Sequence, residues 1–149
     1  MIRIYLDACC LNRPFDDQTQ ARIRLESEAV LMILTECESG DWEWIRSAVL
    51  DWEIEQMPDL ERLRRVKSLV THAHHSVAVG PSEVERAQEL ETWGIAAYDA
   101  LHLACAESGG ADVLLTTDDR LRRRSAARAS ELRVRVANPL TWLREVSEA

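Results

Sequence analysis

The sequence lacks the features that mark several common classes of protein. None of its apolar runs approaches the roughly 18 residues of a membrane-spanning helix. The P-loop pattern G-x-x-x-x-G-K-S/T, the dinucleotide-binding pattern G-x-G-x-x-G and the hydrolase pattern G-x-S-x-G are all absent. Near the N-terminus the only basic residue is Arg3, and Asp7 interrupts the apolar stretch, so we expect no signal peptide and a cytoplasmic protein.

Cysteine pairs of the metal-binding type are also missing. The four cysteines, Cys9, Cys10, Cys37 and Cys105, include no C-x-x-C pair, which argues against a zinc ribbon. Disulfides are rare in a reducing compartment, so we expect these residues to be small apolar parts of the core. Phenylalanine and tyrosine are scarce, at one and two residues, so most of the five tryptophans should supply core or interface bulk, or else stack on nucleic-acid bases.

Basic residues are outnumbered by acidic ones. The 149 residues include 18 Lys and Arg against 26 Asp and Glu, which gives a formal net charge of -8. This balance argues against a protein that coats nucleic acid, but it permits an enzyme that touches nucleic acid locally. Arginines gather at 62–65 and at 120–128, where each group forms either a solvated face or a rim that guides phosphates. The length fits a single domain over residues 1–149.

Predicted strands and helices alternate along nearly the whole chain. Apolar runs predict strands at residues 2–6, 42–48, 75–80, 111–117 and 132–137. Helical periodicity and end signals predict helices at residues 19–39, 49–57, 59–73, 81–94, 96–110, 118–129 and 138–148. Asp16 and Asp17 are candidate caps of the first helix, and the stretch NRPFDD that contains them reads as a turn. The alternation is typical of an α/β fold with a mainly parallel sheet.

Acidic residues follow the ends of predicted strands or open the next helix. They are Asp7, Asp51, Glu53, Asp99, Asp118 and Asp119. Ligand sites of parallel α/β sheets lie at the carboxyl ends of the strands, so four separate segments bring a carboxylate to one edge of the sheet. Clustered carboxylates repel one another, and a divalent cation is the usual reason to assemble them. Mg²⁺ and Mn²⁺ prefer oxygen ligands and leave positions for water, which near a phosphodiester becomes a ready nucleophile.

Each of these acids also has a purely structural interpretation. Asp7 fits an Asx turn, and Asp118 fits the cap of the following helix. Asp99 fits the positive end of a helix dipole, and Glu53 fits a solvated helix surface. His102 stands three residues after Asp99 on the same helix face, where it either supports a metal ligand or is a partly buried structural histidine.

Four stretches of the chain together resemble a known family. They are YLDACCLNRPFDD, IRSAVLDWEIE, AAYDALHLACAE and VLLTTDDRL, and they resemble the PIN-domain ribonucleases, including the VapC-like toxins of bacterial toxin–antitoxin pairs. No single stretch is specific, but the four in this order and spacing are. The resemblance implies a three-layer α/β/α sandwich with a mainly parallel central sheet. It also implies hydrolytic cleavage of RNA with Mg²⁺ or Mn²⁺, a homodimer, and a small antitoxin protein that inserts a segment into the acidic site.

The resemblance also assigns roles to individual residues. The metal-binding and catalytic acids would be Asp7, Glu53, Asp99 and Asp118. Thr116 matches the family's hydroxyl residue near the last acid, and the products would carry 5′-phosphate and 3′-hydroxyl ends. Many members have Thr or Ser and then Asn after the first acid, whereas this chain has Ala8 and Cys9, which lack that hydroxyl and amide.

Two other functions compete with a nuclease. Ala8 and Cys9 support a PIN-like protein-interaction module with weak or no nuclease activity, for which binding of a divalent metal is the discriminating property. A receiver-like or phosphatase-like domain would also place an acid after its first strand. The only lysine is Lys67, so the late lysine of a receiver is missing.

The helix after the second strand carries two acids, and its phase selects one of them. Asp51 and Glu53 are two residues apart, so they point about 200° apart around the helix. Leu50, Ile54 and Met57 form an apolar stripe, and Glu53 lies beside that stripe. We therefore expect Glu53, and not Asp51, to face the metal.

Overall fold

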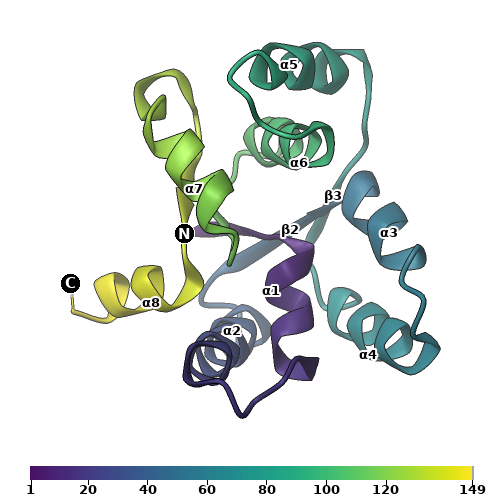
Figure 1. Cartoon of the computed structure of the whole chain (residues 1–149), viewed down its shortest axis with the longest axis vertical. Coiled ribbons are helices and arrows are strands. Elements are labelled where there is room, and N and C mark those ends of the chain that lie inside the picture. Colours follow the sequence, from purple (N-terminus) through teal and green to yellow (C-terminus); the bar gives the residue numbers. More distant parts are fainter. Residues whose placement is uncertain (149) are drawn as a thin grey trace.

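Five short parallel strands lie at the centre of the molecule (Figure 1). The computed structural model describes residues 1–148. The strands are β1 (Arg3–Leu6), β2 (Glu43–Ser47), β3 (His75–Val77), β4 (Val113–Leu115) and β5 (Arg135–Ala137). Their order in the sheet is β3-β2-β1-β4-β5, and each neighbouring pair is parallel. The strand order therefore reverses at β1, the place where such sheets open a crevice for ligands.

Helices cover both faces of this sheet. Within residues 1–148 they are α1 (Ala8–Asn12), α2 (Ala21–Glu38), α3 (Ala48–Glu55), α4 (Leu60–Val70), α5 (Pro81–Glu91), α6 (Ala97–Ser108), α7 (Asp119–Ala126) and α8 (Pro139–Glu148), with 3-10 turns η1 (Arg13–Phe15) and η2 (Ala129–Glu131). Side chains alternate along β1, so Ile4 and Leu6 pack with α1, α2, α4 and α8. Tyr5 points to the opposite face and packs with α5, α6 and α7. The predicted three-layer α/β/α sandwich is confirmed, and its sheet is parallel throughout.

Most predicted helix ends agree with the structure. Gly40 follows α2 with a φ of +88°, and Gly94 follows α5 with a φ of +84°, a region that only glycine enters freely. Asn138 caps α8, because its Oδ1 accepts the backbone N–H of Leu140 at 2.8 Å. These residues terminate or start helices through local hydrogen bonding and backbone freedom, which a sequence shows directly.

One local prediction before α2 is wrong. Asp16 and Asp17 do not cap this helix, which begins at Ala21 without a side-chain cap. Asp17 instead accepts hydrogen bonds from the backbone N–H of Thr19 at 3.0 Å and from its hydroxyl at 2.7 Å, which forms a separate turn. The stretch predicted as a turn does contain a 3-10 turn, Arg13–Phe15, directly after the short helix α1.

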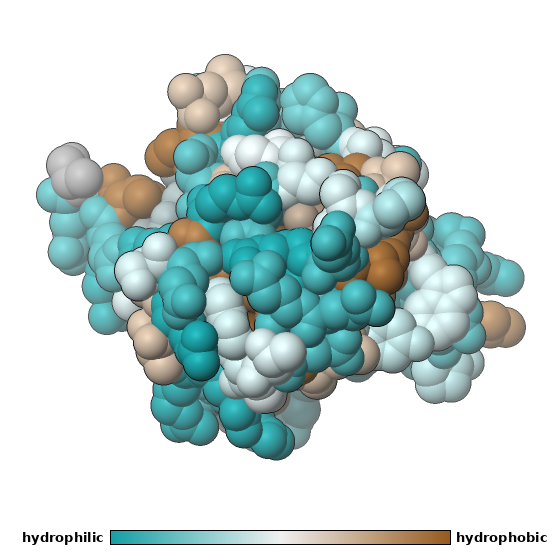
Figure 2. Space-filling view, turned by 90° about the horizontal axis from the view of Figure 1, so that it is seen from above, coloured by the Kyte–Doolittle hydropathy of each residue, from teal (hydrophilic) through white to brown (hydrophobic). Residues whose placement is uncertain are grey.

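One face of the molecule carries only scattered hydrophobic residues (Figure 2). The face shown in Figure 2 is largely hydrophilic, and its hydrophobic residues form small separate patches. No helix within residues 1–148 is both long and apolar enough to cross a bilayer. The exposed large hydrophobic side chains include Leu31, Met32, Trp52 and Tyr98.

Candidate metal centre

Asp7 lies at the carboxyl end of the central strand β1 and caps helix α1. Its Oδ1 accepts the backbone N–H of Ala8 at 2.8 Å, and its Oδ2 accepts the hydroxyl of Thr116 at 3.1 Å. Asp7 is only 6% exposed, and a buried carboxylate is costly unless it has hydrogen-bond donors. Because Thr116 follows β4, donors from two neighbouring strand ends hold this carboxylate in one orientation.

Cys9 lies beside the same carboxylate. Its Sγ is 3.5 Å from Oδ2 of Asp7 and 3.4 Å from Oγ1 of Thr116. The other three cysteines, Cys10, Cys37 and Cys105, are buried, and all four are free. The expectation of core packing is confirmed for those three, and the half-buried Cys9 also packs against the core, at the edge of the candidate site.

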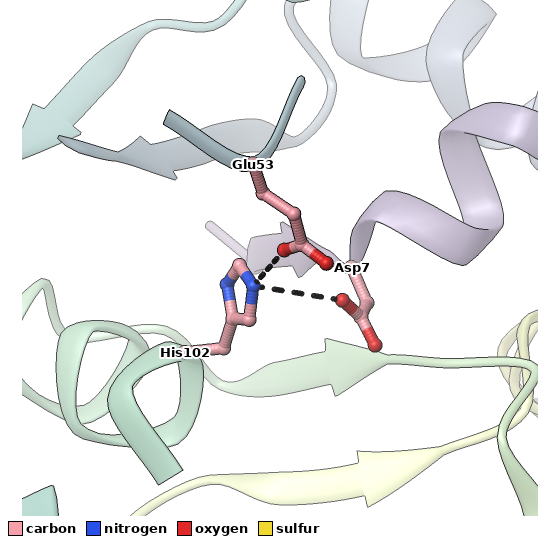
Figure 3. A group of neighbouring side chains, drawn as sticks. All are labelled: Asp7, Glu53 and His102. Carbon is pink, nitrogen blue, oxygen red and sulfur yellow. Dashed lines mark hydrogen bonds and ion pairs between the residues drawn. The ribbon is translucent and has the colours of Figure 1, made fainter. Parts of the chain in front are cut away.

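Glu53 and His102 approach Asp7 from two helices, α3 and α6 (Figure 3). Nε2 of His102 lies 2.5 Å from Oε2 of Glu53 and 3.9 Å from Oδ1 of Asp7. One ligand atom from each residue lies within 4.8 Å of the other two. Ligands on opposite sides of one Mg²⁺ ion are about 4 Å apart, so a small movement would let the carboxylates of Asp7 and Glu53 share a cation.

A buried chain of hydrogen bonds holds His102 from behind. Its Nδ1 lies 2.6 Å from the hydroxyl of Tyr5, which lies 2.6 Å from Oγ of Ser47. Oγ of Ser47 also accepts the backbone N–H of Leu50 at 3.1 Å and so caps α3. With both ring nitrogens protonated, His102 donates to Glu53 and Tyr5, and Tyr5 donates to Ser47. The chain joins α6, β1 and the first turn of the helix that carries Glu53.

The environment of His102 favours its charged form. Burial lowers the pKa of an imidazole, but the hydrogen bond to Glu53 and the charge of Asp7 outweigh burial, so the pKa of His102 is raised. The positive charge of this imidazolium partly balances the two carboxylates. A divalent cation bound to Asp7 and Glu53 would compete with that proton.

Asp99 lies in the first turn of α6, one helical turn before His102. Its carboxylate is half-buried and forms no hydrogen bond or ion pair with another residue of the described chain. Burial, followed by the charges of Asp7 and Asp118, raises the pKa of Asp99 to about 6. A bound cation would relieve the charge repulsion and supply the missing partner. The donor set at this edge of the sheet therefore fits a hard divalent cation.

Asp118 follows β4 and caps α7. Its Oδ1 accepts the backbone N–H groups of Arg120 at 2.9 Å and Leu121 at 3.2 Å, so the structural interpretation of this acid is correct. Asp118 also borders a cavity of about 430 Å³, which it shares with Asp99, Arg120 and Arg124. Nε of Arg124 is buried and has no hydrogen-bond partner among residues 1–148. Acids and arginines thus line the same cavity.

The structure divides the predicted site residues into two groups. Asp7 and Glu53 lie together with His102, whereas Asp99 and Asp118 line the cavity beside them. Asp51 lies elsewhere, with Oδ1 at 3.8 Å from the guanidinium of Arg46, as the helix phase predicts.

Sequence reasoning only partly identified the role of His102. The histidine is 1% exposed, and its ring touches Glu53 and Tyr5, which lie far away in the sequence. Its spacing of three residues from Asp99 was the available signal. That spacing indicates a shared helix face, but it gives no information about the partners of the ring.

Comparisons with known proteins agree with this fold. A family model described as "PIN domain" matches residues 4–127. The crystal structure of PAE2754 from Pyrobaculum aerophilum has a TM-score of 0.57 at 15% identity, over 99% of this chain and 91% of that chain. The structure of VapBC2 from Rickettsia felis, bound to a DNA fragment from their promoter, has a TM-score of 0.58 at 13% identity, over 93% of this chain and 98% of that chain.

The structure of VapBC-1 from nontypeable Haemophilus influenzae has a TM-score of 0.57 at 13% identity, over 93% of this chain and 98% of that chain. At such low identities these likenesses establish the fold alone. A search of curated proteins finds no match. The family model covers most of the chain, and the parallel α/β/α sandwich agrees with it, so this chain belongs to the PIN domain family.

Proposed function

We propose that this chain is an endoribonuclease that depends on Mg²⁺ or Mn²⁺, and that it is the toxin of a toxin–antitoxin pair. The observation that carries this proposal is the convergence of Asp7 and Glu53, with the unpaired Asp99 beside them, where the strand order reverses. Membership of the PIN domain family supports nuclease activity. The toxin role and the antitoxin partner are supported by the resemblance of the four motifs and by the likeness to two VapBC structures.

The acids would hold the cation, and neighbouring groups would fix the acids. The proposed ligands are Asp7, Glu53, Asp99 and Asp118. When bound, a divalent cation supplies an activated water and stabilises charge that develops on the phosphate. Thr116 and the N–H of Ala8 orient Asp7, and His102 restricts the rotamer of Glu53.

Two arginines would help to place the substrate. Arg120 and Arg124 line the cavity that Asp99 and Asp118 border. Guanidinium groups bind phosphate oxygens through charge-assisted hydrogen bonds, so a phosphodiester in this cavity would have positive charge on one side. The same arrangement would place its phosphorus close to the acids.

Incubation of purified protein with single-stranded RNA tests this function. We expect cleavage with Mn²⁺ or Mg²⁺ and no cleavage in EDTA. We also expect products with 5′-phosphate and 3′-hydroxyl ends, because water attacks the phosphorus and the 3′-oxygen leaves. Products that end in a 2′,3′-cyclic phosphate, or undiminished cleavage in EDTA, would contradict the metal mechanism.

A protein-interaction module without catalysis is the second candidate. It is favoured by Cys9, whose thiol lies against Asp7 and offers a poor ligand for Mg²⁺. The two candidates differ in metal binding. If Mn²⁺ and Mg²⁺ at millimolar concentration leave the melting temperature unchanged, the interaction module becomes the better account.

A further inference from the structure

Two exposed aromatic side chains, Trp52 and Tyr98, stack on each other outside the core. Their ring centroids are 5.5 Å apart, and their planes differ by 16°. Trp52 is 50% exposed and Tyr98 is 49% exposed, whereas Trp44 and Trp142 are buried. Aromatic side chains gain much of their stabilisation from burial, so a stacked pair left half in solvent offers a preformed surface for another flat apolar group.

The stacked pair stands beside the candidate metal centre. Trp52 directly precedes Glu53 on α3, and Tyr98 directly precedes Asp99 on α6. Glu53 contacts His102 of α6, so the two helices meet at the site. The stacked rings therefore connect the two helices that carry Glu53 and Asp99.

We propose that Trp52 and Tyr98 form a stacking platform for a nucleobase of single-stranded RNA, next to the phosphodiester that is cut. This inference rests on the proposed function and adds the contact that positions the strand. Every base has a π-face, so such a platform binds without strict sequence preference. Because the ring of Trp52 already rests on Tyr98, it loses less rotamer freedom on binding than an isolated exposed ring would.

Two arginines near the pair favour a nucleic-acid strand as its occupant. Arg120 and Arg124 line the cavity bordered by Asp99, the neighbour of Tyr98, and would meet the phosphates of a strand whose base rests on the pair. The occupant that matches both the rings and the arginines is therefore a polyanion with aromatic bases.

Binding of a labelled RNA tests the platform separately from cleavage. A strand of about ten nucleotides matches the usual site size of proteins that bind single-stranded nucleic acid. Its affinity is measured by fluorescence anisotropy, with Ca²⁺ in place of Mg²⁺. We expect Trp52→Ala to weaken binding between about 5-fold and 100-fold, and Trp52→Phe, which keeps a ring, to weaken it less than about 3-fold. Leu60→Ala removes an exposed side chain of α4 and serves as the matched control, with unchanged affinity.

Abasic RNA distinguishes stacking from a general loss of structure. In the wild-type protein, removal of the base that rests on the platform should weaken RNA binding. In Trp52→Ala, which has already lost the platform, the same removal should reduce the affinity little further. Equal RNA affinities of wild-type protein and Trp52→Ala would overturn the proposal. It would also be overturned if base removal reduced affinity equally in both proteins, or if the wild-type protein did not bind RNA. A shift from dimer to monomer in Trp52→Ala, with unchanged RNA affinity, would also overturn it and would assign the pair to a protein interface.

The outcome of this test is separable from that of the proposed function. Stacking without any cleavage in Mn²⁺ would retain the platform and remove the nuclease. Cleavage by wild-type protein together with unaltered binding by Trp52→Ala would retain the nuclease and remove the platform.

Discussion

Replacement of Asp99 by Asn should stabilise the metal-free protein at neutral pH. The folded-state pKa of Asp99 is about 6, against 3.8 for the free side chain, because the carboxylate is buried and lies near the charges of Asp7 and Asp118. Between about pH 4 and pH 6 the folded state therefore holds a proton that the unfolded chain has lost, so stability falls as the pH rises through this window. Asn carries no charge at any pH and should remove that loss.

The size of the effect follows from the shift. Each pKa unit corresponds to about 1.4 kcal/mol, so the shift sets a ceiling of about 3 kcal/mol. Asp99 is only half-buried, and solvent screening reduces this to about 1.5 kcal/mol. The lost interaction of the carboxylate with the N-terminus of α6 subtracts about 0.5 kcal/mol. We expect Asp99→Asn to be more stable than wild type by about 1 kcal/mol at pH 7.5 in EDTA.

Urea unfolding in EDTA at pH 4.5 and pH 7.5 measures this difference. The gain of Asp99→Asn over wild type should be present at pH 7.5 and should shrink at pH 4.5. In Mn²⁺ the order should reverse, because the wild-type protein gains binding free energy that the variant has lost. A variant less stable than wild type in EDTA at pH 7.5 would refute the claim that this carboxylate is held at a cost.

Three further predictions concern neighbouring groups. Glu53→Gln should weaken Mn²⁺ binding, measured by calorimetry, at least 10-fold. Asp51→Asn, on the other side of α3, should change Mn²⁺ binding little. A larger effect of Asp51→Asn than of Glu53→Gln would mean that the helix phase is wrong. Tyr5→Phe breaks the buried hydrogen-bond chain behind His102 and should lower the free energy of unfolding, measured in urea, by about 1–3 kcal/mol. A decrease of less than about 0.5 kcal/mol would contradict this prediction. The exposed Met32 of α2 lies in the apolar run Val30–Leu34, so we expect a dimer that Met32→Glu dissociates. Light scattering measures the oligomeric state, and a wild-type monomer at tens of micromolar would contradict the dimer.

The sequence predicted the layers of the fold because they depend on local patterns. Continuous apolar runs and helix-end signals located each strand and, within residues 1–148, every helix except α1, which has only five residues and shows no helical period. The β5 strand is shorter than predicted, since only Arg135–Ala137 pairs with β4. Pairing depends on the neighbouring strand and cannot be obtained from the run itself.

The sequence indicated the acids of the candidate site, but it did not indicate the hydrogen bonds that connect the residues of the site. Asp7 and Glu53 followed from strand ends and helix phase, which are local properties. The bond from His102 to Glu53 and the bond from His102 to Tyr5 span 49 and 97 residues of chain. Such contacts, and the burial that raises the pKa of Asp99, arise only when α3, β1 and α6 are packed together.

Single-turnover cleavage of RNA by wild-type protein and Asp7→Asn is the most direct test of the central claim, that this edge of the sheet is a metal-dependent nuclease centre. Asp41→Asn is the matched control, because Asp41 is exposed just before β2 at the opposite edge of the sheet. We predict that wild type and Asp41→Asn cleave RNA in Mn²⁺ at similar rates, and that Asp7→Asn is slower by a factor on the order of 100 or more. Cleavage by Asp7→Asn at the wild-type rate, or equal cleavage by all three proteins in EDTA, would contradict the account.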